Sequence, residues 1–232
     1  MGNETPEARE ILAAAEAGEG RTEDKGKRPF WKRYAFPLAV LALCLILAGY
    51  LVWNLNPKQK MPVIGPAPEF TLQDLDGNSV SLSGTNGKVR LLYFFFANCP
   101  DVCPPTTFLL SKVQDELKAK NLFGNKAEIL SVTIDPQRDT PEALRAFAGN
   151  YHADFSGWKF LRGEEKATAD LAAKYDVPVV KDDQGNFTHL NLFVLIDKEG
   201  KIRDYISAND YIENGSNNLP VSDIVQKIES LT

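Results

Sequence analysis

The sequence predicts one α/β domain carried on a single N-terminal transmembrane helix. Three observations lead to this prediction: an uncharged apolar run at residues 34–53, alternating strand and helix patterns across residues 67–232, and only three cysteines among 232 residues. Three cysteines are too few for a fold built on disulfide bonds. The domain must therefore depend on an apolar core, and a cysteine pair within it is better explained by function than by structure.

The composition is that of an ordinary folded domain. Hydrophobic residues make up 44% of the chain, charged residues make up 25%, and the net charge is −5. A negative net charge gives no support for binding nucleic acid through a basic face. We therefore expect no nucleic-acid partner.

The apolar run Tyr34–Trp53, "YAFPLAVLALCLILAGYLVW", is interpreted as a membrane anchor. A helix of about 20 apolar residues crosses a bilayer. Tyr34, Tyr50 and Trp53 lie near the ends of the run, where aromatic rings favour the membrane interface. Cys44, inside the run, is interpreted as an apolar membrane residue. This helix is expected to contact the membrane lipid.

The charges around the apolar run predict its orientation. Residues 25–33, "KGKRPFWKR", contain five basic residues and no acidic one. By the positive-inside rule, the N-terminus is cytoplasmic and the domain after Trp53 lies on the extracytoplasmic side of the cell membrane. A cleaved signal peptide is the alternative interpretation. It fits less well, because the leader and the run are long and no A-x-A-like site follows.

Two further segments lie outside the folded domain. Residues 1–33 are rich in Glu, Ala, Gly and Lys, which predicts a disordered cytoplasmic tail. Residues 54–66 are predicted to be a linker, because the stretch "NPKQKMPVIGPAP" that begins at Asn56 contains four prolines. Proline-rich linkers are extended spacers. The domain itself is expected over residues 67–232.

The sequence of the first half of the domain predicts a hairpin, followed by two strands that are buried on both faces and have a helix between them in sequence. Residues 69–83 alternate around a D-G-N turn, which is typical of a hairpin. Residues 88–97, "KVRLLYFFFA", and residues 127–135, "AEILSVTID", are near-continuous apolar runs, as expected for strands covered on both faces. Between them, residues 107–120 carry a helical apolar stripe.

The second half predicts helices and a closing hairpin. Thr140 and Pro141 give residues 140–151 a strong helix start. The remaining elements are a helix at 164–175, two strands within 189–207 joined at D-K-E-G, and a final helix at 220–231 capped by Ser222. Strand, helix, strand, helix, hairpin and helix is the order of a thioredoxin-like fold.

Cys99 and Cys103, in "FFFANCPDVCPPTT", lie between a buried strand and a helix. The carboxyl end of a central strand is where α/β sheets place their sites. Pro104 and Pro105 suit the first helical turn, so Cys103 is expected at or just before the helix N-terminus. The helix dipole is expected to lower the pKa of its thiol. Both a disulfide and a two-thiolate metal site are plausible for this pair.

Three observations favour metal over a simple dithiol. The cysteines have three residues between them, whereas a thioredoxin-type reductase has two. The strand expected to carry a cis-proline opposite the dithiol has no proline, and His189 stands there instead. Two thiolates with an imidazole suit Cu(I), while a structural zinc site needs a fourth ligand. The same cysteines can oxidise to a disulfide, so redox chemistry remains open.

Other polar residues are weaker candidates. His152 is expected at a helix end, where a basic group favours the dipole, rather than at a metal. Asp135 ends a buried strand and is a candidate for orienting a ligand from the second layer around the site. Asp139 is expected to pair with Arg138 or to support the helix start.

Three motifs carry a resemblance to a known family. "FANCPDVCPPT", "TIDPQRDTPEALRAF" and "THLNLFVLID" resemble, in order and spacing, the motifs of the SCO/SenC family of membrane-anchored copper proteins, over about Pro66 to Thr232. The resemblance implies a thioredoxin-like fold with Cys99, Cys103 and His189 as copper ligands. It implies Cu(I), with Cu(II) as the other oxidation state.

The resemblance also implies a function and partners. The family delivers copper to the binuclear copper site of cytochrome c oxidase subunit II, and a donor protein must supply that copper. Some members are argued to act as thiol-disulfide reductases on the target cysteines. Ala97, Asn98 and Thr106–Thr107 depart from the family's usual residues. These departures affect the rim of the site and no ligand.

Two hypotheses follow from the sequence. The first is a copper metallochaperone, which transfers its cargo without catalysing a turnover. The second is a membrane-anchored thiol-disulfide oxidoreductase that reduces the target's copper-ligand cysteines. A peroxiredoxin-like peroxidase is a more distant third, because the loop around Cys99 does not match a peroxidatic loop.

Overall fold

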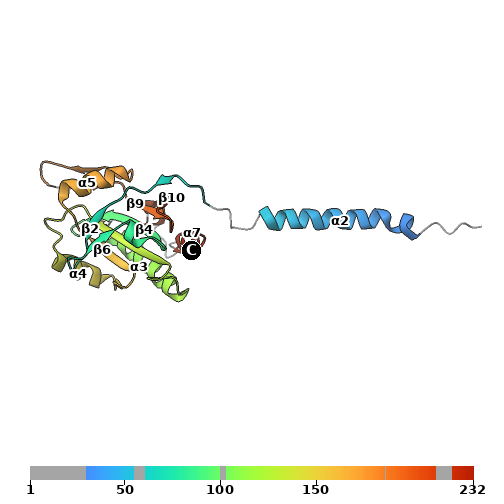
Figure 1. Ribbon diagram of the computed structural model, residues 1–232, viewed down its shortest axis with the longest axis horizontal. Helices are drawn as coiled ribbons and strands as arrows, with labels where there is room; N and C mark the ends of the chain where they lie inside the picture. Colours follow the sequence, from blue (N-terminus) through green and yellow to red (C-terminus); the bar gives the residue numbers. More distant parts are fainter. Residues whose placement is uncertain (1–29, 55–60, 100–102, 186, 213–220) are drawn as a thin grey trace, which may run out of the picture. The chain divides into compact units, whose positions relative to one another are not determined.

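The computed structural model describes residues 30–54, 61–99, 103–185, 187–212 and 221–232 (Figure 1). The chain divides into two compact units, residues 1–57 and residues 58–232, and each is described by itself. The predicted tail at residues 1–33 falls almost wholly outside the described residues, as does much of the predicted linker. Both therefore stay predictions.

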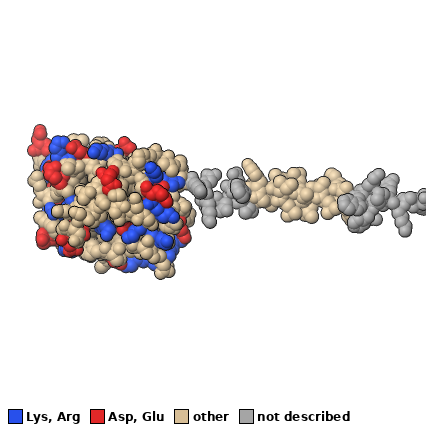
Figure 2. Space-filling model, viewed as in Figure 1, with Lys and Arg blue, Asp and Glu red and all other residues tan. Residues whose placement is uncertain are grey.

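The N-terminal unit contains one described helix, α2 (Phe30–Asn54). Tyr34–Leu51 is long and apolar enough to cross a membrane, and its side chains are exposed. On the face seen in Figure 2, the described part of this helix shows no charged side chain. An apolar helix at the predicted place is therefore confirmed. A signal sequence would pass the same test of length and composition.

The C-terminal unit is built around a mixed sheet (Figure 1). Among the described residues, six strands form it in the spatial order β1 (Gly65–Pro66), β10 (Lys201–Ser207), β9 (Leu192–Ile196), β4 (Val89–Phe95), β5 (Ala127–Thr133) and β6 (Trp158–Leu161). Strands β4, β5 and β6 run parallel, whereas β9 is antiparallel to both β4 and β10. This order places β4 at the centre, as its continuous apolar sequence predicts.

Two small hairpins lie beside this sheet. The first joins β2 (Thr71–Gln73) to β3 (Ser79–Ser81), as the alternating pattern predicts. The second joins β7 (Val179–Lys181) to β8 (Phe187–His189), and it was not predicted. Strand β6 was also not predicted. The unexpected hairpin carries His189, one of the predicted ligands.

The helices are α3 (Cys103–Ala119), α4 (Pro141–Asn150), α5 (Glu165–Lys174), α6 (Asn209–Ile212) and α7 (Val221–Glu229), with a 3₁₀ turn at Ser83–Thr85. The predicted start of α4 is confirmed: the Thr140 side chain accepts a hydrogen bond from the Ala143 amide at 3.2 Å. The predicted Ser222 cap is wrong, because α7 already begins at Val221 and places Ser222 inside the helix.

Side chains of β4 alternate between two helical layers. Phe95 stacks on Phe147 of α4, with ring centroids 5.5 Å apart. Phe94 points to the other face and contacts Tyr175, which directly follows α5. Figure 1 accordingly shows α5 on the opposite side of the sheet from α4 and α3. This sheet covered on both faces is the predicted thioredoxin-like α/β architecture.

Candidate metal centre

The cysteine pair lies where β4 ends and α3 begins. All residues of β4 are buried, and the strand is paired on both sides, with β5 and with β9. The chain then turns, and the Cys99 amide donates to the Phe96 carbonyl at 3.3 Å. Cys103 is the first residue of α3, which confirms its predicted place at the helix N-terminus. The fold therefore delivers both sulfurs to one end of the central strand.

The two thiols are buried and lie close together. Cys103 is fully buried, Cys99 is 8% exposed, and neither forms a disulfide. The neighbouring Cys99 thiol and burial raise the pKa of Cys103, and they outweigh the lowering effects of the Phe96 backbone and the Tyr93 hydroxyl. The predicted low pKa for Cys103 is therefore wrong, because the adjacent Cys99 thiol and burial both favour the protonated thiol.

His189 is the last residue of β8 and lies opposite Val179. It does not open the final hairpin, as the sequence suggested, because Leu190 and Asn191 separate it from β9. Its Nδ1 atom donates to the Leu190 carbonyl at 2.9 Å, since a carbonyl oxygen can only accept. Nε2 therefore keeps its lone pair.

The surroundings of His189 favour its neutral form. Burial lowers the pKa of the imidazole, opposed by the Leu190 carbonyl and by the charge of Cys99. The ring also meets the Phe96 ring edge-on, with centroids 6.1 Å apart. A neutral imidazole with a free Nε2 is the form that binds a metal ion.

The three predicted ligands share one end of the sheet, but they do not form a closed ligand set. In the part of the chain that the structure describes, no group of three or more His, Cys, Asp or Glu side chains has metal-holding geometry. The donors nonetheless fit copper chemically, because two thiols and a neutral imidazole are the soft-to-intermediate ligands that suit Cu(I). The assignment of Cys99, Cys103 and His189 as ligands stays a prediction.

Asp135 contacts Arg138, which in turn contacts the hairpin that carries His189. The Asp135 side chain is only 2% exposed and forms an ion pair with the Arg138 guanidinium. That guanidinium also donates to the Gly185 carbonyl at 3.1 Å and lies over the Phe187 ring, both in the hairpin that carries His189. Asp135 thus connects the end of β5 to the His189 hairpin.

Asp139 does not pair with Arg138, so that expectation is wrong. Its buried carboxylate instead accepts hydrogen bonds from the Ala97 amide, at 3.0 Å, and from the Thr133 hydroxyl. Arg138 forms its ion pair with Asp135 instead, because the Asp139 carboxylate points into the protein. Asp139 therefore ties the loop before Cys99 to the end of β5, a role that the sequence alone did not indicate.

Three buried polar residues near the cysteines were also missed: Tyr93, Thr106 and Asn191. Tyr93 belongs to a run of aromatic residues that the sequence assigns to the core. Thr106 and Asn191 are far apart in sequence, yet the Asn191 amide group donates to the Thr106 hydroxyl at 2.9 Å. Only the polar character of Asn191 in an otherwise apolar stretch could have drawn attention to it.

His152 lies just beyond the end of α4, as predicted. Its backbone has a positive φ of 52°, and its carbonyl accepts a hydrogen bond from the Gln114 side chain at 3.1 Å. These are structural contacts.

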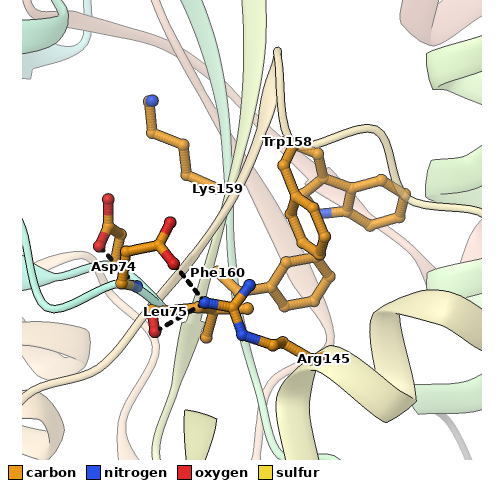
Figure 3. A pocket seen from close by; sticks show the side chains of 8 residues that line it. Asp74, Leu75, Arg145, Trp158, Lys159 and Phe160 are labelled. Atoms are coloured by element: carbon orange, nitrogen blue, oxygen red, sulfur yellow. Dashed lines mark hydrogen bonds and ion pairs between the residues drawn. The ribbon is translucent and has the colours of Figure 1, made fainter. Parts of the chain in front are cut away.

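A separate pocket lies beside β6 (Figure 3). It is lined by Asp74, Leu75, Asp76, Arg145, Phe155, Trp158, Lys159 and Phe160. Arg145 reaches across it, donates to the Leu75 carbonyl at 3.0 Å and pairs with Asp76. The pocket has no cysteine or histidine in its lining, so it offers none of the donors that copper prefers.

Comparisons with known proteins agree with this architecture. The sequence profile described as SCO1/SenC matches residues 59–220. The SCO1 protein homolog of Bacillus subtilis (strain 168) is 35% identical over 174 residues, which cover 74% of this chain and 85% of that protein.

Two solved structures are also similar. BsSco, described as a member of the Sco family of cytochrome c oxidase assembly proteins with a disulfide switch, has a TM-score of 0.63 and 31% identity, covering 75% of this chain and 97% of that one. Yeast Sco1 with copper bound has a TM-score of 0.57 and 29% identity, covering 74% and 91% respectively.

We predict opposite pH dependences for two aspartate variants. Burial raises the pKa of the Asp139 carboxyl above its usual value of about 4. The protonated carboxyl therefore stabilises the folded state at low pH. This contribution is lost as the pH rises through the raised pKa. The stability of Asp139→Asn relative to wild type should therefore improve between pH 4 and pH 7, as measured by urea unfolding.

Asp154→Asn is the matched control. The Lys118 ammonium lowers the pKa of Asp154 to about 2, so its contribution is present above about pH 4 and is lost as pH falls towards 2. This variant should lose stability relative to wild type as pH rises from 2. Parallel trends for both variants would contradict the burial argument for Asp139.

Proposed function

The chain belongs to the SCO1/SenC family, and on that premise we propose that it is a copper metallochaperone with Cys99, Cys103 and His189 as its ligands. Its target is the binuclear copper site of cytochrome c oxidase subunit II, and a separate donor protein loads it. The observation that supports this most directly is the pair of adjacent buried thiols at the start of α3, with a neutral imidazole on the neighbouring hairpin. The copper-bound yeast relative supports the choice of metal.

The residues of the chain explain how the cargo could be held and released. Both cysteines must lose their protons to bind metal, so loading releases protons. The Leu190 carbonyl holds His189 in the tautomer that presents Nε2. Two soft thiolates and an imidazole favour Cu(I). Transfer then proceeds by exchanging each ligand for a thiolate of the acceptor before the next one leaves.

Asp135 has a positioning role in this proposal. Its ion pair with Arg138 leaves the guanidinium oriented towards the Gly185 carbonyl and the Phe187 ring. These contacts hold the β7–β8 hairpin, and so His189, near the cysteines. Asp135 orients a ligand in this way, without binding the metal itself.

The alternative function is reduction of a disulfide in the target. Cys99 is 8% exposed and Cys103 is fully buried, which favours Cys99 as the attacking sulfur. Cys99 would attack the target disulfide and release one target thiol. Cys103 would then attack Cys99 and release the second thiol, so that the target gains two electrons and the chain keeps a Cys99–Cys103 disulfide.

Removal of single ligands tests the metallochaperone function. We expect His189→Ala to weaken Cu(I) binding by at least about tenfold, since even the loss of a group that only orients a ligand costs about 10- to 100-fold. Cys99→Ser and Cys103→Ser should abolish stoichiometric binding. Competition titration of the reduced protein with a chromophoric Cu(I) chelator measures this. His152→Ala is the control, and a wild-type affinity for His189→Ala would disprove the proposed ligand set.

Trapping of a mixed disulfide tests the alternative. With the oxidised soluble domain of cytochrome c oxidase subunit II as substrate, Cys103→Ser should accumulate a mixed disulfide through Cys99, whereas Cys99→Ser should not. Non-reducing electrophoresis and peptide mass analysis identify the linkage. His189→Ala should still reduce the substrate. Absence of the adduct with Cys103→Ser would count against reduction.

The anchor and its orientation belong to the same proposal, with α2 retained, the N-terminus cytoplasmic and the C-terminal domain extracytoplasmic. A reporter that is active only after export, fused after Thr232, should be active. The mass of the mature protein should include residues 1–33. A mature chain beginning after α2, or an inactive reporter on a stable fusion, would contradict this part of the proposal.

A further inference from the structure

Phe187 lies close to two cations on the hairpin that carries His189. The guanidinium carbon of Arg138 lies 5.9 Å from the centre of the Phe187 ring, and the Nζ atom of Lys181 lies 4.8 Å from the same centre. A cation within about 6 Å of an aromatic ring centre is attracted to the face of that ring. The Phe187 side chain is buried, so the ring is also partly shielded from water.

Each of the two cations forms an ion pair with a different element of the domain. Arg138 pairs with the buried carboxylate of Asp135, which lies just beyond the end of β5. The Nζ atom of Lys181 lies 2.5 Å from Oε1 of Glu165, the first residue of α5. Through these cations the Phe187 ring is attached to α5 and to the end of β5.

Phe96 connects the Phe187 ring to the His189 ring. Phe187 and His189 are two residues apart on β8, so their side chains point to the same face of the hairpin. The Phe96 ring lies near both, with centroid distances of 5.7 Å to Phe187 and 6.1 Å to His189. Phe96 is buried, and its carbonyl accepts a hydrogen bond from the Cys99 amide. The three rings thus join the hairpin to the turn that carries Cys99.

The hairpin needs such contacts, because its own pairing is short. Strands β7 and β8 have three residues each, and a two-stranded hairpin is marginally stable by itself. Phe187 is the one buried residue in these two strands. It is therefore the side chain through which the core of the domain can hold the hairpin.

We propose that Phe187 is a positioning residue that holds His189 beside the cysteine pair. Its ring is fixed by Arg138 and Lys181, and it acts on the imidazole through Phe96. The proposal rests on the proposed function, in which His189 binds copper.

Hydrogen exchange in the metal-free protein tests whether Phe187 holds the hairpin. Phe187→Leu keeps a large apolar side chain and removes the aromatic face. In this variant of the full chain, reduced and in mild detergent, the amides of residues 179–181 and 187–189 should exchange about three- to tenfold faster than in wild type, because two cation–π contacts are lost. The amides of β4 should be unaffected. Val180→Thr changes an exposed residue of the same hairpin and is the matched control, for which exchange should stay at the wild-type rate.

A double-mutant cycle separates the cation–π contact from simple packing. Lys181→Met keeps most of the side-chain stem and removes the charge. It should speed exchange of the hairpin in the wild-type background and have a smaller effect in the Phe187→Leu background, where the ring is already absent. Loss of the ion pair with Glu165 is common to both backgrounds and cancels. Equal effects in the two backgrounds would overturn the cation–π assignment.

The NMR signals of the His189 imidazole test the link to the ligand. The chain has two histidines, so His152 serves as the internal reference. At about pH 8, where a free imidazole is neutral, long-range proton–nitrogen correlations should show wild-type His189 with its proton on Nδ1, the atom that lies 2.9 Å from the Leu190 carbonyl. Phe187→Leu should move the His189 signals towards the average of the two tautomers and leave those of His152 in place.

Copper release distinguishes this inference from the proposed function. In the proposed function, Cu(I) should pass from Phe187→Leu to a chromophoric chelator faster than from wild type, because the hairpin that carries a ligand opens more often. Unchanged hairpin exchange, or unchanged His189 signals, in folded Phe187→Leu would overturn the inference. Altered exchange and signals together with a wild-type release rate in both Phe187→Leu and His189→Ala would instead overturn the proposed function, because His189 would then not be a ligand.

Discussion

Burial of β4 on both faces and pairing along both edges determine where the chain places its cysteine pair. The strand has no exposed residue, and its backbone is hydrogen-bonded to β5 and to β9. Such a strand cannot shift its register without exposing its apolar side chains on one face. Its end is therefore a fixed point from which the chain turns into Cys99 and α3. The hydrophobic core around β4 therefore determines where Cys99 and the start of α3 lie.

The polar contacts around this end each tie one element to another. Asp139 hydrogen-bonds the loop before Cys99 to the end of β5. Arg138 links Asp135 to the β7–β8 hairpin through a hydrogen bond to the Gly185 carbonyl. Asn191 hydrogen-bonds the segment after His189 to Thr106 of α3. Asp139, Asp135 and Asn191 are buried, so an unmade hydrogen bond at any of them is costly, whereas the Arg138–Gly185 contact is exposed. A site whose donors come from separate elements depends on such ties, because no single element carries both the cysteines and the histidine.

The sequence predicted the elements that have a strong local signal. Continuous burial of β4 and the Thr140–Pro141 helix start are examples, and so is Cys103 at the start of α3. The β7–β8 hairpin escaped prediction because its strands are three residues long and largely exposed. The raised pKa of Cys103 and the pairing of Arg138 with Asp135 depend on neighbours that only the folded chain brings together.

The unequal exposure of the two cysteines imposes an order on either function. Cys103 is sealed by the core, while Cys99 retains slight exposure. An incoming sulfur, either an acceptor thiolate that takes up copper or a sulfur of a target disulfide, would therefore meet Cys99 first in either proposed function. The adjacent Cys99 thiol and burial also raise the pKa of Cys103, which favours its protonated form and makes it the less reactive of the two thiols. In the two proposed functions the first contact is therefore the same, and the difference lies at Cys103. In metal transfer its sulfur loses a proton to solvent and binds the metal. In disulfide exchange its thiolate attacks the Cys99 sulfur and releases the second target thiolate, which takes up a proton.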